Sequence, residues 1–154
     1  MNTIEPVRKE VVVGVSAEKA FRVFTDGINT WWPRSHHIGS SPLKRAIIEP
    51  REGGRWYSES EDGTECDTGK VLVWDPPKRL VMTWQLTAAW KFDPEFITEV
   101  EVNFTADGPN RTKVVLEHRN LERYGAVAAA VRSQIGAETG WGLIIDNFVT
   151  AAAA

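Results

Sequence analysis

Residues 30–37, with the sequence TWWPRSHH, hold two adjacent tryptophans and, shortly after them, two adjacent histidines. Imidazole rings bind metal ions or transfer protons near neutral pH, and indole rings pack on flat apolar molecules. Neighbouring residues of a regular element point in different directions, so His36 and His37 are poorly placed to share one metal. The third histidine, His118, lies far along the chain, and Cys66 is the only cysteine. The sequence therefore predicts no metal site.

Covalent and cofactor chemistry has little support in the sequence. No Gly-x-Ser-x-Gly elbow occurs, and Cys66 has no histidine close to it. The segment GWGLI (140–144) is not a dinucleotide fingerprint, because it lies in a predicted helix without a strand before it. We therefore expect no cofactor and assign no catalytic residue. Acid–base catalysis by His36, His118 or Glu117 stays open, since it needs only one positioned group near a polarised substrate.

Seven tryptophans are the most unusual feature of the composition. Some can fill the core, but seven in a chain of 154 residues exceed what packing needs. This excess favours a cavity with aromatic walls, in which indole N–H groups and one histidine would orient a ligand. Trp31 and Trp32 cannot both face inward on one short turn, so we expect one in the core and one at the cavity.

The rest of the composition is typical of a soluble globular protein. The chain is 42% hydrophobic and 25% charged, with a net charge of −3 from interspersed signs. This balance argues against a nucleic-acid or membrane-surface partner. We find no membrane-spanning run, no signal-peptide core and no pair of cysteines, so we expect a cytoplasmic location and a single domain over residues 1–154.

The predicted elements begin with a β-branched strand at 7–15, followed by a helix capped by Ser16 and one further helical turn in INTWWP. Strands then follow at 43–50, 53–60, 65–77 and 78–86, and a hairpin covers 98–118. Within them we expect a kink at Gly69, and we expect Lys113 and Glu117 to lie opposite Glu99 and Glu101 on the solvent face.

A long helix is predicted after Asn120, where Trp141 and Phe148 recur at helical spacing. A curved antiparallel sheet closed by a helix rich in glycine and alanine would leave space between them. Trp74 shares the parity of Leu72 in its strand, and Trp84 shares the parity of Leu80 and Met82 in its own. This parity suggests that both tryptophans and these neighbours lie on the inner face of the sheet.

This order of elements resembles the START/Bet v 1-like (SRPBCC) helix-grip superfamily, and within it bacterial proteins similar to the C-terminal domain of the activator of Hsp90 ATPase. The segments that carry the resemblance are VSAEKAFRVFTDGINTWWP (15–33), GGRWY (53–57), GKVLVWDPPKRLVMTW (69–84), TEVEVNFTADGPNRTKVVLEH (98–118) and GWGLIIDNF (140–148). It implies an α+β helix-grip fold, with two short helices after the first strand and a long C-terminal helix. It also implies that Trp32 and His36 lie near the opening of an internal pocket.

We therefore expect a binding protein for a small apolar, aromatic or lipid-like ligand. The predicted ligand-binding residues are Trp32, His36, Trp56, Trp74, Trp84 and Trp141. Two alternatives remain: an enzyme of the cyclase or dehydratase type that uses the same cavity, and a chaperone-associated interaction module. Whether the chain forms a homodimer also stays open.

Overall fold

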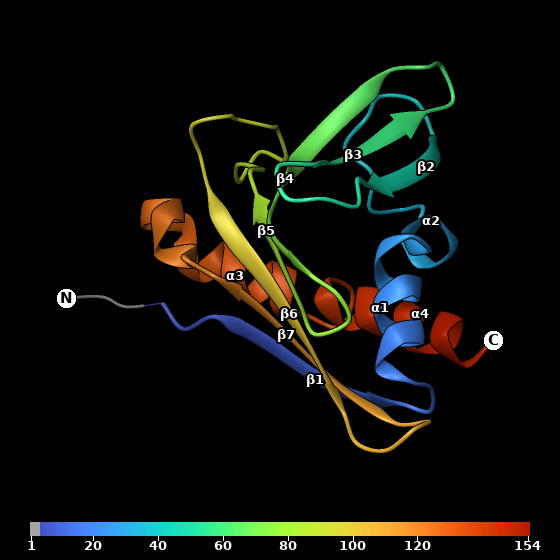
Figure 1. Cartoon of the computed structure of the whole chain (residues 1–154). Coiled ribbons are helices and arrows are strands. Elements are labelled where there is room, and N and C mark those ends of the chain that lie inside the picture. Colours follow the sequence, from blue (N-terminus) through green and yellow to red (C-terminus); the bar gives the residue numbers. More distant parts are fainter. Residues whose placement is uncertain (1–3) are drawn as a thin grey trace.

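The computed structural model describes residues 4–154 and contains a seven-stranded antiparallel sheet that curves around the helices (Figure 1). The strands are β1 (Val7–Val13), β2 (Leu43–Ile48), β3 (Arg55–Ser60), β4 (Glu65–Asp75), β5 (Arg79–Trp84), β6 (Thr98–Ala106) and β7 (Thr112–Arg119). Their spatial order is β1-β7-β6-β5-β4-β3-β2. Strands β2 to β7 thus pair in sequence order, and β1 pairs with β7 at one edge. The expected helix-grip class is confirmed.

The helices cover the concave side of the sheet (Figure 1). They are α1 (Ala17–Thr25), α2 (Ile28–Trp31), the 3-10 helix η1 (Leu121–Val127), α3 (Ala128–Gly136) and the long C-terminal helix α4 (Trp141–Ala153). Ser16 begins α1 as predicted, because its side chain accepts a hydrogen bond of 3.2 Å from the backbone N–H of Lys19. Helix α4 packs on β1, α1 and α2. No helix within residues 4–154 combines the length and apolar character that a membrane span requires.

The predicted helical stretch after Asn120 is interrupted before α4. Residues 137–140 leave the helical conformation, and Gly140 has φ −96° and ψ −118°. A Cβ atom at Gly140 would overlap the carbonyl oxygen of Ile135, so only glycine fits this corner. The interruption separates α3 from α4 and leaves Thr139 exposed between the two helices.

A bulge in β4 bends the sheet at the predicted kink. Trp56 pairs with Gly69 whereas Tyr57 pairs with Asp67, which leaves Thr68 as the extra residue. A Cβ atom at Gly69 would overlap the backbone carbonyl of Thr83 on β5. Glycine therefore allows the two strands to approach closely here. In Figure 1, β2, β3 and the first half of β4 stand away from the rest of the sheet.

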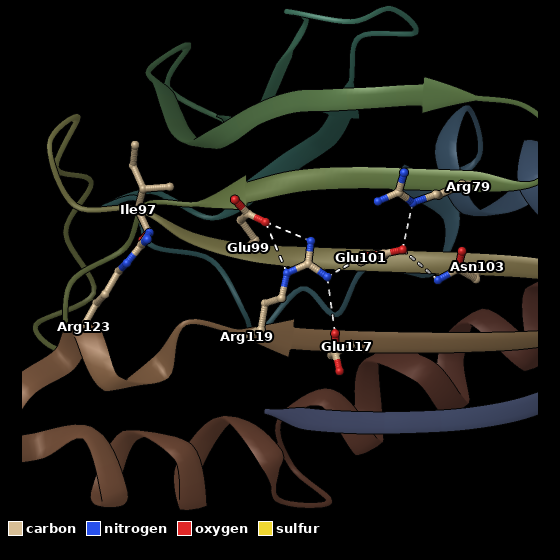
Figure 2. A network of polar contacts seen from close by, with 8 residues as sticks. All are labelled: Arg79, Ile97, Glu99, Glu101, Asn103, Glu117, Arg119 and Arg123. Carbon is tan, nitrogen blue, oxygen red and sulfur yellow. Dashed lines mark hydrogen bonds and ion pairs between the residues drawn. The ribbon is translucent and has the colours of Figure 1, made fainter. Parts of the chain in front are cut away.

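The solvent face of β5–β7 carries a network centred on Arg119, which Figure 2 shows in detail. The Arg119 guanidinium donates hydrogen bonds to Glu99, Glu101 and Glu117. The alternation predicted for this hairpin is confirmed, and Glu117 lies directly opposite Glu101, as predicted. The predicted place of Lys113 is wrong, because Lys113 lies opposite Thr105 and pairs with Glu10 of β1 at 3.5 Å.

Candidate functional site

A hollow of about 570 Å³ opens between the inner face of β3–β5, the loop after α2 and the junction of α3 with α4. This volume lies in the range of small-molecule sites, about 300–1,000 Å³. Its lining combines aromatic and aliphatic side chains with a smaller polar set. The lining residues are Trp32, Ser35, His36, His37, Ile38, Ala46, Trp56, Tyr57, Ser58, Thr68, Trp84, Leu86, Ala89, Trp90, Lys91, Gln134, Ile135, Thr139, Gly140, Trp141 and Ile144.

Five of these residues are tryptophans in mutual contact, and we call them the tryptophan wall: Trp32, Trp56, Trp84, Trp90 and Trp141. Trp84 is central, because its ring centroid lies 5.7 Å from those of Trp56 and Trp141 and 6.4 Å from that of Trp90. Trp32 joins from the loop side, 5.9 Å from Trp56 and 6.2 Å from Trp141. Most of these pairs meet edge to face, an arrangement that stabilises aromatic clusters. The wall is thus built by interlocked rings from five separate segments.

A chain of hydrogen bonds runs behind this wall through a fully buried histidine. Trp141 Nε1 donates to His118 Nδ1 at 3.0 Å, and His118 Nε2 lies 2.9 Å from the hydroxyl of Thr98. The Thr98 hydroxyl donates in turn to the carbonyl of Trp84 at 2.9 Å. An indole N–H can only donate, so Nδ1 must be the acceptor and the proton of the neutral ring must be on Nε2. Burial lowers the pKa of His118 to about 3, which keeps the ring neutral.

We predicted that indole N–H groups orient a ligand, but three indoles of the wall have N–H groups that do not face the hollow. The N–H of Trp141 is taken by His118, and the N–H of Trp32 donates to the carbonyl of His36 at 3.0 Å. The Trp84 Nε1 atom is sealed from solvent and has no hydrogen-bond partner within residues 4–154. It lies toward Tyr124, whose hydroxyl donates to the carbonyl of Leu86. These three indoles therefore present ring surface to the hollow rather than N–H donors.

His36 and His37 fasten the loop after α2 to opposite sides of the opening. His36 Nε2 lies 2.6 Å from the carbonyl of Thr139, which requires a proton on that nitrogen. His37 Nε2 lies 2.8 Å from the buried hydroxyl of Ser60, and its Nδ1 lies 3.3 Å from the hydroxyl of Ser58. The two rings therefore have separate hydrogen-bond partners. Within the described chain, no group of three or more histidine, cysteine, aspartate or glutamate side chains is arranged to hold a metal ion.

The polar lining residues of the hollow come from several segments. Tyr57, Ser58 and Thr68 come from β3 and the β4 bulge, and Lys91 comes from the turn after β5. The others are Ser35, His36 and His37 in the loop after α2, and Gln134 and Thr139 near the junction of α3 with α4. Arg55 stacks on the Tyr57 ring at 3.9 Å from its centroid. The hollow therefore combines the tryptophan wall with hydrogen-bonding groups from several segments.

The structure gathers five of the six predicted site residues at this hollow: Trp32, His36, Trp56, Trp84 and Trp141. Trp74 lies elsewhere. It faces inward opposite Leu80, but it packs on Phe21 of α1 at 5.1 Å and lines a separate, shallower hollow with Pro76. Trp31 lies in the core, where its N–H donates to the carbonyl of Val23 at 2.8 Å.

Sequence reasoning missed Tyr57 and Lys91, and it placed Trp90 in a loop without deciding whether that residue caps the pocket or meets a partner. Trp90 belongs to a connection rather than to a strand, so no parity rule applies to it. Its backbone is left-handed, with φ 61°, which no propensity would assign to tryptophan. Tyr57 has the opposite parity to Trp56 and lies beside the β4 bulge, yet both residues line the hollow.

Comparisons with known proteins agree with this architecture. The family model described as "Activator of Hsp90 ATPase homolog 1-like protein" matches residues 14–153. The chain is similar to an anthrahydroquino-γ-pyrone synthase, Txn09, with 38% identity, coverage of 96% of this chain and 97% of that chain, and a TM-score of 0.67. It is also similar to the self-sacrificing resistance protein CalC from Micromonospora echinospora, with 32% identity, coverage of 96% and 94%, and a TM-score of 0.72.

A more distant structure shares the fold alone. The Aha1 dimer from Colwellia psychrerythraea is 17% identical, with coverage of 97% of both chains and a TM-score of 0.65. Among functionally curated proteins, none matches the sequence.

Proposed function

The chain belongs to the activator of Hsp90 ATPase homolog 1-like family, and we propose that it binds a small, flat, apolar or aromatic molecule in the hollow behind the His36 loop. The observation that carries this proposal is the tryptophan wall. Five interlocked indoles offer large ring surfaces to a hollow of about 570 Å³. Flat aromatic rings gain both dispersion and favourable stacking on such surfaces, about 0.5–1.5 kcal/mol per ring pair beyond burial.

Two of the similar structures support the proposal. One is named as a synthase of an anthrahydroquino-γ-pyrone, which is a fused-ring aromatic compound, and the chain is 38% identical to it over nearly its whole length. The other is named as a resistance protein. The first name concerns a small aromatic molecule, and both structures share this fold.

Native mass spectrometry of freshly purified protein tests the proposal first, since a co-purifying small molecule would support it. Quenching of tryptophan fluorescence by neutral flat aromatics, such as anthracene-2-carboxamide, tests it directly. We expect Trp32→Ala to weaken this binding about tenfold, because Trp32 is half-buried at the opening and its loss removes stacking surface. Trp74→Ala is the matched control, because that indole lies in the other hollow. Absence of quenching, or equal weakening by both variants, would contradict the proposal.

A second candidate is an enzyme of the cyclase type in the same hollow. The observation that favours it is the position of His37, a half-buried titratable ring that lines the hollow beside Ser58. His118 is excluded from this role, because it is fully buried and does not line the hollow. His36 lines the hollow, but its Nε2 must keep a proton to donate to the carbonyl of Thr139. The partners of His37 are the hydroxyls of Ser58 and Ser60, which can donate or accept, so its ring can take up or release a proton without losing them. We therefore assign the acid–base role in this candidate to His37.

Hydrogen–deuterium exchange at the acidic methylene group of anthrone, followed anaerobically by mass spectrometry, distinguishes the two candidates. An enzyme with a positioned base should accelerate the exchange, and His37→Gln should abolish the acceleration. His36→Gln is the control, because it removes a histidine from the same loop while leaving His37 in place. A rate equal to that of buffer would leave ligand binding as the function.

A further inference from the structure

The charged residues that line the hollow differ in balance from those of the whole chain. The whole protein has 21 acidic and 18 basic side chains, a net charge of −3. None of the 21 lining residues is acidic, and Lys91 is the one lysine or arginine among them. The ion pairs found among residues 4–154 do not include Lys91. An unpaired cation beside a carboxylate-free hollow favours an anionic partner.

The backbone around Lys91 is fixed by a tight turn. The N–H of Thr87 donates to the carbonyl of Lys91 at 2.9 Å, and the N–H of Trp90 donates to the carbonyl of Thr87 at 2.9 Å. Leu86 and Phe92 close the turn as a β-bridge. The left-handed backbone of Trp90 changes the direction of the chain, and Trp90 and Lys91 both line the hollow. An aromatic residue and a lysine are thus adjacent in the lining.

The lining sets two requirements for a ligand. Three of the five wall indoles, those of Trp32, Trp84 and Trp141, have N–H groups that do not face the hollow, so they offer stacking without hydrogen bonds. Polar residues also line the hollow, among them Ser58 on β3 and Lys91 at the edge. A molecule that meets both requirements is flat and carries an oxygen atom at one edge.

We propose that the ligand is a flat aromatic acid, whose rings lie on the tryptophan wall and whose carboxylate or phenolate oxygen pairs with the Lys91 ammonium at the opening. This inference rests on the proposed function, because it names the chemical class of ligand for the same hollow. The ammonium is exposed, so it acts as a selecting group at the edge while the rings supply most of the binding energy.

Two probes of equal shape test the role of charge: anthracene-2-carboxylate and its neutral amide, anthracene-2-carboxamide. Binding is measured by tryptophan quenching at pH 7.5. We expect the wild type to bind the carboxylate about five- to tenfold more tightly than the amide at low salt, and about 0.5 M NaCl to narrow this gap. Lys91→Gln should remove the gap by weakening carboxylate binding alone, and Lys91→Arg should restore most of it.

Lys70→Gln is the matched control, because Lys70 is an exposed lysine on β4 that does not line the hollow. It should leave the gap unchanged. Equal affinity of the wild type for both probes, or a gap that persists in Lys91→Gln, would overturn the inference while the proposed function stands. Failure of both probes to bind would instead remove the proposed function, and the inference with it.

Discussion

The indole nitrogen of Trp141 donates to Nδ1 of His118 at 3.0 Å, and this bond sets the proton position of a histidine with no exposed surface. Because Nδ1 must accept, Nε2 carries the proton and donates to Thr98. The histidine thereby ties α4 to β7 and β6 and holds the indole of Trp141 with its N–H turned away from the hollow. A buried polar chain of this kind, with every group satisfied, specifies one arrangement of the wall.

The first prediction concerns acid sensitivity. The pKa of His118 is about 3 in the folded state and close to 6.5 in the unfolded state. The unfolded chain therefore binds more protons between these values, and stability is complete above pH 6.5 and decreases as the pH falls toward 3. We expect the free energy of unfolding to fall by roughly 1 kcal/mol per pH unit between pH 6 and pH 5 from this group. Urea denaturation at several pH values measures this slope.

His118→Gln is the control for this slope. Glutamine can still accept from Trp141 and donate to Thr98, but it does not titrate. The variant should lose the contribution of His118 to the slope. If it does not fold, the nitrogen chemical shifts of the wild-type imidazole decide the matter, since they should report a neutral Nε2–H ring at pH 5. A titration midpoint of His118 near 6.5 would disprove the assignment.

The second prediction concerns the bend in β4. Gly69→Ala should destabilise the protein by about 2–3 kcal/mol, because the new Cβ atom would overlap the carbonyl of Thr83 and force β4 and β5 apart. Urea denaturation measures the change. Gly14→Ala is the matched control, since a Cβ atom there meets no heavy atom within 4 Å and should alter stability by less than about 0.5 kcal/mol. Equal effects of the two substitutions would show that the close approach is not required.

Much of the fold could be predicted because its signals are local. Ser16 caps a helix through its own side chain, and the alternation in β6 and β7 follows from one buried face. Gly69 was recognisable as a kink because glycine interrupts an otherwise β-branched strand. These features depend on a few neighbouring residues, which a single sequence displays.

The features that failed depend on contacts between distant residues. The extra residue Leu72 shifts the register of β4 against β5, so Leu72 is 41% exposed while Trp74 still faces inward. Parity cannot reveal such a bulge. The direction of an indole N–H depends on its partner, and for Trp141 that partner is 23 residues away in the chain. The location of Trp74 away from the hollow likewise follows from its contact with Phe21 of α1.

The third prediction concerns the network of Figure 2. Glu101 lies opposite Glu117, and Arg119 bonds to both carboxylates. Hydrogen bonds from Arg79 and, next, from Arg119 hold the pKa of Glu101 at about 2. We expect Arg119→Gln to reduce the free energy of unfolding by about 1–2 kcal/mol at pH 7, because like charges are left facing each other.

The pH dependence of this variant has a definite sign. In the wild type, Glu101 contributes stability above pH 4.5 that is lost as the pH falls toward 2, because its folded pKa is depressed. Arg119→Gln should reduce this acid-dependent contribution and make unfolding at pH 7 less sensitive to salt. Arg111→Gln is the control, since its ion pair with Asp107 is largely exposed and should be worth less than about 0.5 kcal/mol. Equal destabilisation by the two variants would contradict the network.

The last prediction separates stability from binding at Trp90. Its φ of 61° is a left-handed conformation that costs a bulky residue about 1–2 kcal/mol, whereas glycine adopts it freely. Trp90→Ala keeps this strain and loses the ring, and Trp90→Gly loses the ring but also relieves the strain. We therefore expect the glycine variant to be about 1 kcal/mol more stable than the alanine variant in urea denaturation.

Both variants should bind anthracene-2-carboxylate equally and several-fold more weakly than the wild type, because the ring beside Trp84 is absent from both. A glycine variant less stable than the alanine variant would show that the turn is not strained, and wild-type affinity in either variant would remove Trp90 from the wall. A tryptophan held at this cost at the edge of the hollow is consistent with selection for binding rather than for folding.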